Sequence, residues 1–142
     1  MNPREYYDKL IDGLPAGSER AVARIISYHI GLENAIKKDE LIEECKRVGI
    51  HFSDERQARA VIVSLRKMGY LICSSSGNSG YFIAQSLSEY QEFRTREYIK
   101  KIKDMAETTR AMDTASQQIF SIEINAASAQ PALFQPSEAA NV

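Results

Sequence analysis

Residues 74–82 read SSSGNSGYF, a polar run with two glycines that ends in two aromatic residues. Short apolar segments lie on either side of it, YLIC at 70–73 and YFIA at 81–84. Two strand-forming segments joined by a polar, glycine-containing run are typical of a β-hairpin. The sequence therefore predicts a single hairpin in a chain whose other segments favour helices.

Three segments before the hairpin have the apolar spacing of amphipathic helices. One is predicted over 3–12, a second from 19 to about 30 with Ser18 as its N-cap and Gly31 at its end, and a third over 38–48 with Gly49 as its C-cap. Their predicted inward residues are Tyr6, Tyr7, Leu10 and Ile11, then Val22, Ile25, Ile26, His29 and Ile30, and finally Leu41, Ile42 and Cys45.

A further helix is predicted directly before the hairpin, over DERQARAVIVSLRKM at 54–68. Ser53 is its expected N-cap, acidic residues follow at the positive end of the helix dipole, and Gly69 ends it. Helices at 19–30, 38–48 and 54–68 followed by a hairpin have the order of a winged helix-turn-helix, in which the hairpin is the wing. The expected core of this part is Ala58, Val61, Ile62, Leu65, Met68, Leu71, Tyr81 and Ile83.

Residues 86–120 contain no glycine or proline and predict a long helix. Ser86 and Glu89 fit a capping box at its start. Further along, seven residues recur at alternating steps of four and three, which is the pattern of a coiled-coil seam weakened by Thr109 and Ser116. Pairing with a second copy is the preferred interpretation, and a helix that folds back on its own domain is the alternative. The seam residues are Tyr98, Ile102, Met105, Thr109, Met112, Ser116 and Ile119.

The predicted fold class is mainly α with a small β-hairpin, a winged helix-turn-helix domain followed by a long, coiled-coil-like helix. The 142 residues suffice for one compact domain with additional segments. We expect an N-terminal extension with a short helix at 1–17, the winged helix-turn-helix domain at 18–85, the dimerisation helix at 86–120, and a tail at 121–142. The tail is rich in Ala, Ser, Gln and Pro and is expected to be disordered.

The net charge of −1 is unevenly distributed along the chain. Residues 18–85 carry ten Lys and Arg against eight Asp and Glu, a balance of +2, which permits nucleic-acid binding without requiring it. Cys45 and Cys73 are isolated and suit a reducing compartment. The N-terminus lacks the apolar core of a signal peptide, and no segment approaches membrane-spanning length. We therefore expect a soluble cytoplasmic protein with no membrane partner.

The outward face of the helix at 54–68 is the candidate surface for reading double-stranded DNA. Arg56, Gln57 and Arg59 lie in its N-terminal half, and Arg suits guanine and Gln suits adenine because each can bond two base-edge atoms at once. The alternative for these residues is an ordinary solvated face, or a pair with Asp54 or Glu55 on the same helix. Further DNA contacts are expected from Ser64, Lys67, Lys38, Ser75 and Asn78.

The remaining polar residues indicate structural roles rather than a catalytic or metal-binding site. Arg66 is expected to tie the end of its helix to the hairpin. His29 and His51 have no partner at metal-ligand spacing, and no glycine-rich phosphate loop or nucleophile elbow is present. The sequence thus predicts no enzyme activity, no metal and no cofactor.

The stretch from 54 to 84 resembles the DNA-binding domain of the biotin repressor. The chain from 38 to about 112 is similar to the small winged-helix proteins of bacteriophages and prophages. The resemblance implies a winged helix-turn-helix fold, and because no biotin ligase domain is present, it implies no ligase activity. The matching residues are Ile62, Leu65, Arg66, Gly69, Gly80 and Tyr81.

The tail contains QPALF at 130–134, which resembles the short peptide by which many bacterial proteins bind the replication sliding clamp. Leu133 and Phe134 would fill an apolar pocket and Gln130 would bond at its edge, although Pro131 replaces the preferred Leu.

Taken together, these features of the sequence give two hypotheses for the function. The first is a DNA-binding homodimer of phage type in transcription regulation or replication. The alternative is an adaptor that binds a host protein such as the clamp without reading DNA sequence.

Overall fold

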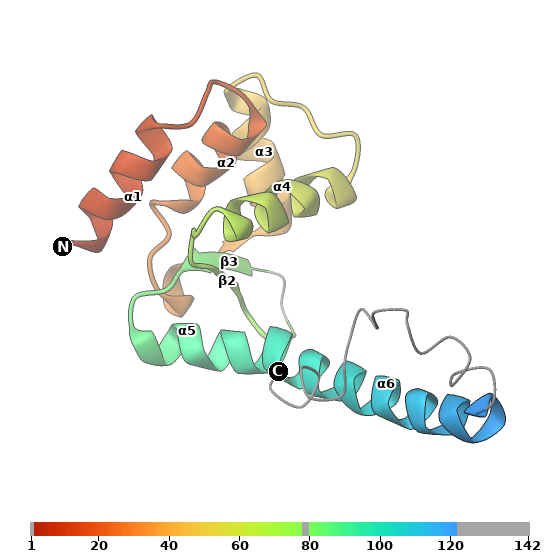
Figure 1. Cartoon of the computed structure of the whole chain (residues 1–142). Helices are drawn as coiled ribbons and strands as arrows, with labels where there is room; N and C mark the ends of the chain where they lie inside the picture. The colour runs from red at the N-terminus through yellow and green to blue at the C-terminus, as the bar shows by residue number, and fades with distance from the viewer. Residues whose placement is uncertain (1, 78–79, 122–142) are drawn as a thin grey trace. The chain divides into compact units, whose positions relative to one another are not determined.

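The computed structural model of the chain describes residues 2–77 and 80–121. This part is mainly helical, with a small three-stranded antiparallel sheet and a long C-terminal helix (Figure 1). The chain divides into two compact units, residues 1–93 and 94–142. In order, the elements are α1 (Pro3–Asp12), α2 (Ser18–Ile26), the 3-10 turn η1 (Leu32–Asn34), β1 (Ile36–Lys37), α3 (Lys38–Arg47), α4 (Glu55–Lys67), β2 (Ile72–Ser74), β3 (Gly80–Ile83), α5 (Leu87–Arg94), the π-helical segment η2 (Thr95–Ile99) and α6 (Lys100–Ile119).

Helix α1 is confirmed where the sequence predicts it. The side chain of Asn2 caps it by accepting a hydrogen bond from the Arg4 backbone N–H at 3.0 Å. Tyr7 and Ile11 are buried in the main core, whereas Tyr6 is exposed. The N-terminal segment is therefore packed into the first unit.

Helix α2 ends four residues earlier than the predicted limit near residue 30. The reason is the sheet, because the backbone beyond the helix pairs with β3. The Ile83 N–H donates to the His29 carbonyl at 2.8 Å, and the Gly31 N–H donates to the Ile83 carbonyl at 2.9 Å. The expected N-cap at Ser18 is also wrong, since Ser18 is the first helical residue and Gly17 precedes it without a side-chain cap.

Helices α3 and α4 end in the same way, at the two glycines that the sequence indicates. Gly49 and Gly69 have φ of +85° and +100°, a left-handed conformation that L side chains rarely adopt. The next residue then folds back on the helix, with the Ile50 N–H donating to the Cys45 carbonyl at 2.9 Å and the Tyr70 N–H to the Leu65 carbonyl at 3.1 Å.

The predicted hairpin is present as β2 and β3, with Cys73 opposite Phe82. The structure adds a third strand, β1, which pairs with β3 on its other side. The strand order β1-β3-β2 places β3, the last of the three strands in sequence, at the centre of the sheet. The sequence does not predict β1 because two residues are too few to show an alternating pattern.

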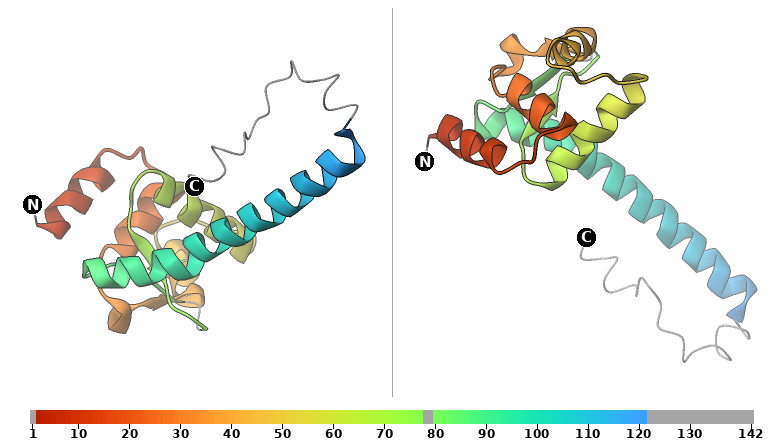
Figure 2. Two further views of the ribbon diagram at one scale, coloured as in Figure 1. Left: turned by 60° about the horizontal axis from the view of Figure 1, so that its bottom comes forward. Right: turned by 90° about the horizontal axis from the view of Figure 1, so that it is seen from above.

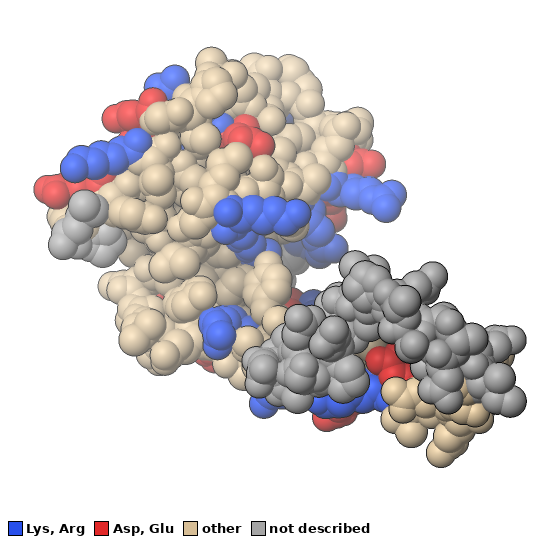
Figure 3. Space-filling view, in the orientation of Figure 1, with Lys and Arg blue, Asp and Glu red and all other residues tan. Residues whose placement is uncertain are grey.

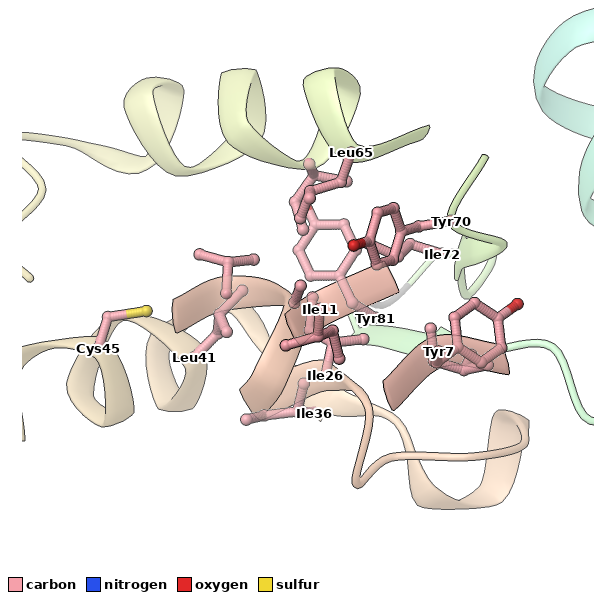
Figure 4. Packing of buried hydrophobic residues seen from close by; sticks show 14 residues of the cluster. Tyr7, Ile11, Ile26, Ile36, Leu41, Cys45, Leu65, Tyr70, Ile72 and Tyr81 are labelled. Carbon is pink, nitrogen blue, oxygen red and sulfur yellow. The ribbon is translucent and has the colours of Figure 1, made fainter. Parts of the chain in front are cut away.

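Both faces of the sheet are covered. Helices α1 to α4 lie on one side and α5 lies on the other (Figure 1). On the α5 side, Cys73 and Phe82 pack with Phe93 in a small separate cluster. The main core, which Figure 4 shows from close by, contains Tyr7, Ile11, Val22, Ala23, Ile26, Ile36, Leu41, Cys45, Ile62, Leu65, Tyr70, Ile72, Tyr81 and Ile83.

Besides Tyr6, two residues predicted for the core are exposed instead. Met68 is 45% exposed because it follows the last helical residue of α4 as its C-cap. Leu71 is 40% exposed and lies just before β2, whose first residue, Ile72, is the one that enters the main core. Tyr81 and Ile83 are buried as predicted.

The helix predicted over 86–120 is realised as α5, η2 and α6 in succession (Figure 2). The Glu89 N–H donates to Ser86 Oγ at 3.2 Å, and Glu89 Oε1 accepts from the Gln85 N–H at 2.8 Å, so the predicted capping pair forms. The π-helical segment is not predicted. No helix in the described part of the chain combines the length and apolar character needed to cross a membrane.

Candidate nucleic-acid interface

The start of α4 is fixed by a hydrogen-bonded cap. Asp54 Oδ1 accepts from the Gln57 N–H at 3.0 Å, and Gln57 Oε1 accepts from the Ser53 N–H at 2.9 Å. Asp54 is therefore the N-cap, and the predicted N-cap at Ser53 is wrong. The physical reason is the residue three positions after Asp54, because Gln57 donates its N–H to Asp54 and its side-chain oxygen accepts from the N–H of Ser53, an acceptor role that Arg56 cannot fill.

The cap engages one of the predicted base-reading residues. The Gln57 carboxamide oxygen is bonded to the backbone at Ser53. A bidentate contact with adenine uses both the oxygen and the nitrogen of the amide. Gln57 must therefore release Ser53 before it can read a base, whereas Arg56 and Arg59 have no such bond in the described residues.

A hollow of about 190 Å³ lies where α3, α4 and β3 meet. Three of the predicted DNA contacts, Lys38, Arg56 and Arg59, line it. With Glu55 as its one acidic lining residue, the hollow has a balance of three cations to one anion. Its remaining lining residues are apolar or aromatic, namely Leu41, Ile42, Ala58 and Tyr81.

The cations of the hollow form no ion pair within the described residues. The alternative that Arg56 pairs with Asp54 or Glu55 on its own helix is therefore not realised. At the end of α3 the reverse holds, since Lys46 contacts Glu43 at 3.1 Å and Arg47 contacts Glu44 at 2.7 Å. Figure 3 shows Lys and Arg side chains gathered around the position of α4.

Ser64 does not face outward as predicted. It is half-buried, and its Oγ donates to Glu19 Oε1 on α2 at 2.9 Å. This part-buried bond ties α4 to α2. Lys67, the last residue of α4, is exposed as predicted.

In the hairpin, Ser75 closes the loop. Its Oγ accepts from the Gly80 N–H at 3.2 Å, and its own N–H donates to the Gly80 carbonyl at 3.1 Å. The predicted contact Asn78 lies outside the described residues, as do Gln130, Leu133 and Phe134 of the tail motif.

Arg66 links α4 to the hairpin as the sequence predicts. Its Nε donates to the Ile72 carbonyl at 2.7 Å, and its guanidinium lies 4.8 Å from the centre of the Phe93 ring. The contact with Phe93 is not predicted, because it depends on α5 folding onto the sheet. Tyr81 is likewise predicted only as a core residue, although it also lines the cationic hollow.

The titratable groups with raised pKa values are buried core residues. Burial raises the pKa of the Cys45 thiol to about 11 and that of the Tyr7 hydroxyl to about 12. Cys45 is therefore a protonated thiol at neutral pH and packs as a small apolar residue. The described residues contain no group of three His, Cys, Asp or Glu side chains that could hold a metal ion.

Comparison of the chain with protein-family models, with curated proteins and with solved structures finds no match in any of the three.

Proposed function

We propose that this chain binds double-stranded DNA, with α4 as the helix that enters the major groove. The observation that carries the proposal is the cationic hollow, where Lys38, Arg56 and Arg59 meet without an ion-pair partner among the described residues. Unpaired cations at one site are suited to phosphate oxygens and to the acceptor atoms of guanine.

The element order supports this proposal. Helices α2, α3 and α4 followed by β2 and β3 are the order of a winged helix-turn-helix, in which the last helix reads base edges with its N-terminal residues. In this arrangement Arg56 and Arg59 are the base readers, and Lys38 at the start of α3 is a phosphate contact. We further propose a role in transcription regulation or phage replication, as the resemblance to phage proteins implies.

The test is selection of bound duplexes from a random DNA pool at moderate salt, with the wild-type chain and with Arg56→Ala combined with Arg59→Ala. We expect an enriched sequence that the double variant loses, and a cost for Arg59→Ala alone of about 1–3 kcal/mol at one base position. The matched control is Lys46→Ala with Arg47→Ala, which removes the same charge from residues that are already ion-paired.

Equal loss of affinity on every sequence would instead make Arg59 a phosphate contact. For Lys38→Ala we expect the affinity for DNA to fall by a similar factor on every sequence. The slope of log affinity against log salt concentration should become smaller by about one. Absence of any enriched sequence would overturn the proposal and favour the adaptor function, which the lack of Lys and Arg between residues 68 and 93 also suits.

A further inference from the structure

Helix α6 carries an apolar stripe. Within the 20 residues of this helix none is buried, and Met105, Met112 and Ile119 are each at least 67% exposed. The seam predicted from the sequence includes Tyr98, but Tyr98 lies in the π-helical segment η2, where the helical period is wider. We therefore define the α6 stripe as Ile102, Met105, Thr109, Met112, Ser116 and Ile119, all within regular α-helix.

We propose that the α6 stripe pairs with the α6 stripe of a second copy of this chain, and that the two helices run antiparallel. The stripe follows alternating steps of three and four residues, which is the spacing by which one helix packs along another. This inference does not rest on DNA binding, because all of its contacts lie within α6.

The order of side chains along the stripe favours the antiparallel orientation. In a parallel, in-register pair each position meets itself, so Thr109 would face Thr109 and Ser116 would face Ser116, leaving two layers without a large apolar residue. In an antiparallel pair with Ile102 opposite Ile119, the two polar positions each face a methionine. Thr109 then lies opposite Met112, and Met105 opposite Ser116. Every layer therefore buries at least one large apolar side chain.

The hydroxyl of Thr109 is compatible with burial in such a pair. Its Oγ1 donates to the Met105 carbonyl within the same helix at 2.8 Å. A hydroxyl that is already bonded does not carry the full penalty of an unsatisfied buried donor. Thr109 can thus enter the interface without a partner from the second copy.

The charges of α6 favour the same orientation. Lys100, Lys101 and Lys103 cluster at its start, where Lys101 contacts Glu97 at 3.2 Å and Asp104 follows. Further along lie Glu107, Arg110 and Asp113, so the first four residues of α6 carry its largest excess of like charge. A parallel pair would place the two lysine clusters side by side. In the antiparallel pair, at a rise of about 1.5 Å per residue, equivalent lysines lie about 22 Å (Lys103) to about 31 Å (Lys100) apart along the axis, which exceeds the Debye length of roughly 10 Å at 0.1 M salt.

The first measurement is the mass of the full chain by sedimentation equilibrium, without DNA. We expect a concentration-dependent dimer that Met105→Lys with Met112→Lys reduces to monomer. The matched control is Thr114→Lys with Gln117→Lys, which adds the same charge away from the stripe. Circular dichroism checks that α6 remains helical in both variants, since Lys is a good helix former. Thr109→Ile is the gain-of-association variant and should tighten the dimer.

The second measurement reports the orientation. A spin label on Lys100→Cys should give a distance of roughly 35 Å or more in the antiparallel dimer, against about 20 Å in a parallel one. The unmodified chain is the labelling control, because Cys45 and Cys73 are both buried. A monomeric wild type, a dimer indifferent to Met105→Lys with Met112→Lys, or the short label distance would each overturn the proposal.

Discussion

At the residue scale, Arg66 joins three elements with one side chain. It extends from α4, donates to the backbone of β2 and lies over an aromatic ring of α5. One rigid, planar guanidinium makes both contacts at once, donating from Nε while it lies over the Phe93 ring, and the point-like ammonium of Lys does not reproduce this combination. Arg66 is therefore a structural residue at the junction of the helices and the sheet.

We expect Arg66→Lys to lower the free energy of unfolding by about 1–3 kcal/mol, because it loses the hydrogen bond to the Ile72 carbonyl and the contact with Phe93. Urea unfolding of the full chain measures this change. Lys67→Ala, at the exposed neighbour, should change stability by no more than about 0.5 kcal/mol. Equal effects of the two substitutions would show that Arg66 has no structural role.

The cap of α4 gives a second prediction at this scale. Asp54→Ala should cost about 1 kcal/mol of stability, because the Gln57 N–H loses its acceptor. Ser53→Ala should leave stability almost unchanged, since only the Ser53 backbone takes part in the cap. Thermal unfolding of the two variants side by side decides which residue is the N-cap.

At the scale of elements, the sequence predicts the helices and strands that are marked by apolar periodicity and by capping or glycine residues at their ends. Helices over 3–12, 38–48 and 54–68, the hairpin and the Ser86–Glu89 cap all follow from residues near one another in the chain. The missed features depend on distant partners. Strand β1 and the early end of α2 exist because β3 pairs with both.

The candidate site also combines features that local sequence predicts with features that depend on distant partners. Arg56, Arg59 and Lys38 are found from their positions on predicted helices, but their meeting in one hollow depends on the packing of α3 against α4. The predicted outward position of Ser64 is wrong because the residue that accepts its hydrogen bond, Glu19, lies 45 positions away in the sequence. Gln57 is a plausible base reader by type, and only the geometry of the cap shows that its amide oxygen is already bonded.

The cluster of Cys73, Phe82 and Phe93 predicts a specific chemical change. Phe93→Ala should lower stability by about 3–5 kcal/mol and open a path to the Cys73 thiol. In a thiol-reagent assay under native conditions we expect Cys73 to react much faster in this variant, while Cys45 remains protected in the main core. Leu87→Ala, on an exposed part of α5, is the control, and in this variant both thiols should react as slowly as in the wild type.

At the scale of the whole molecule, the raised pKa values of buried groups predict the response to high pH. Folding raises the pKa of Cys45 from 9.0 to about 11 and that of Tyr7 from 10.0 to about 12. Both groups are buried in their neutral form. Their contribution to the free energy of unfolding is therefore fully present at pH values below their pKa in the unfolded chain, and it is lost as the pH rises through their pKa in the folded chain. Stability should therefore fall between about pH 9 and pH 12.

Urea unfolding at a series of alkaline pH values measures this decline. Cys45→Ala should be less stable than wild type at pH 7, because it leaves a small cavity. It should nevertheless lose less stability between about pH 9 and pH 11, since it has no thiol to ionise. Parallel curves for the two proteins would show that Cys45 does not contribute to the alkaline response.

The central position of β3 has a consequence for biosynthesis. When the ribosome has released only the first 74 residues, β1, β2 and the backbone at Ile30 all lack the strand that pairs with each of them. The sheet can close only after residues 80–83 emerge, and its second face is covered only after Phe93. Nascent chains that stall between these points present unpaired, apolar strand edges, which is the form in which partly made proteins associate with one another.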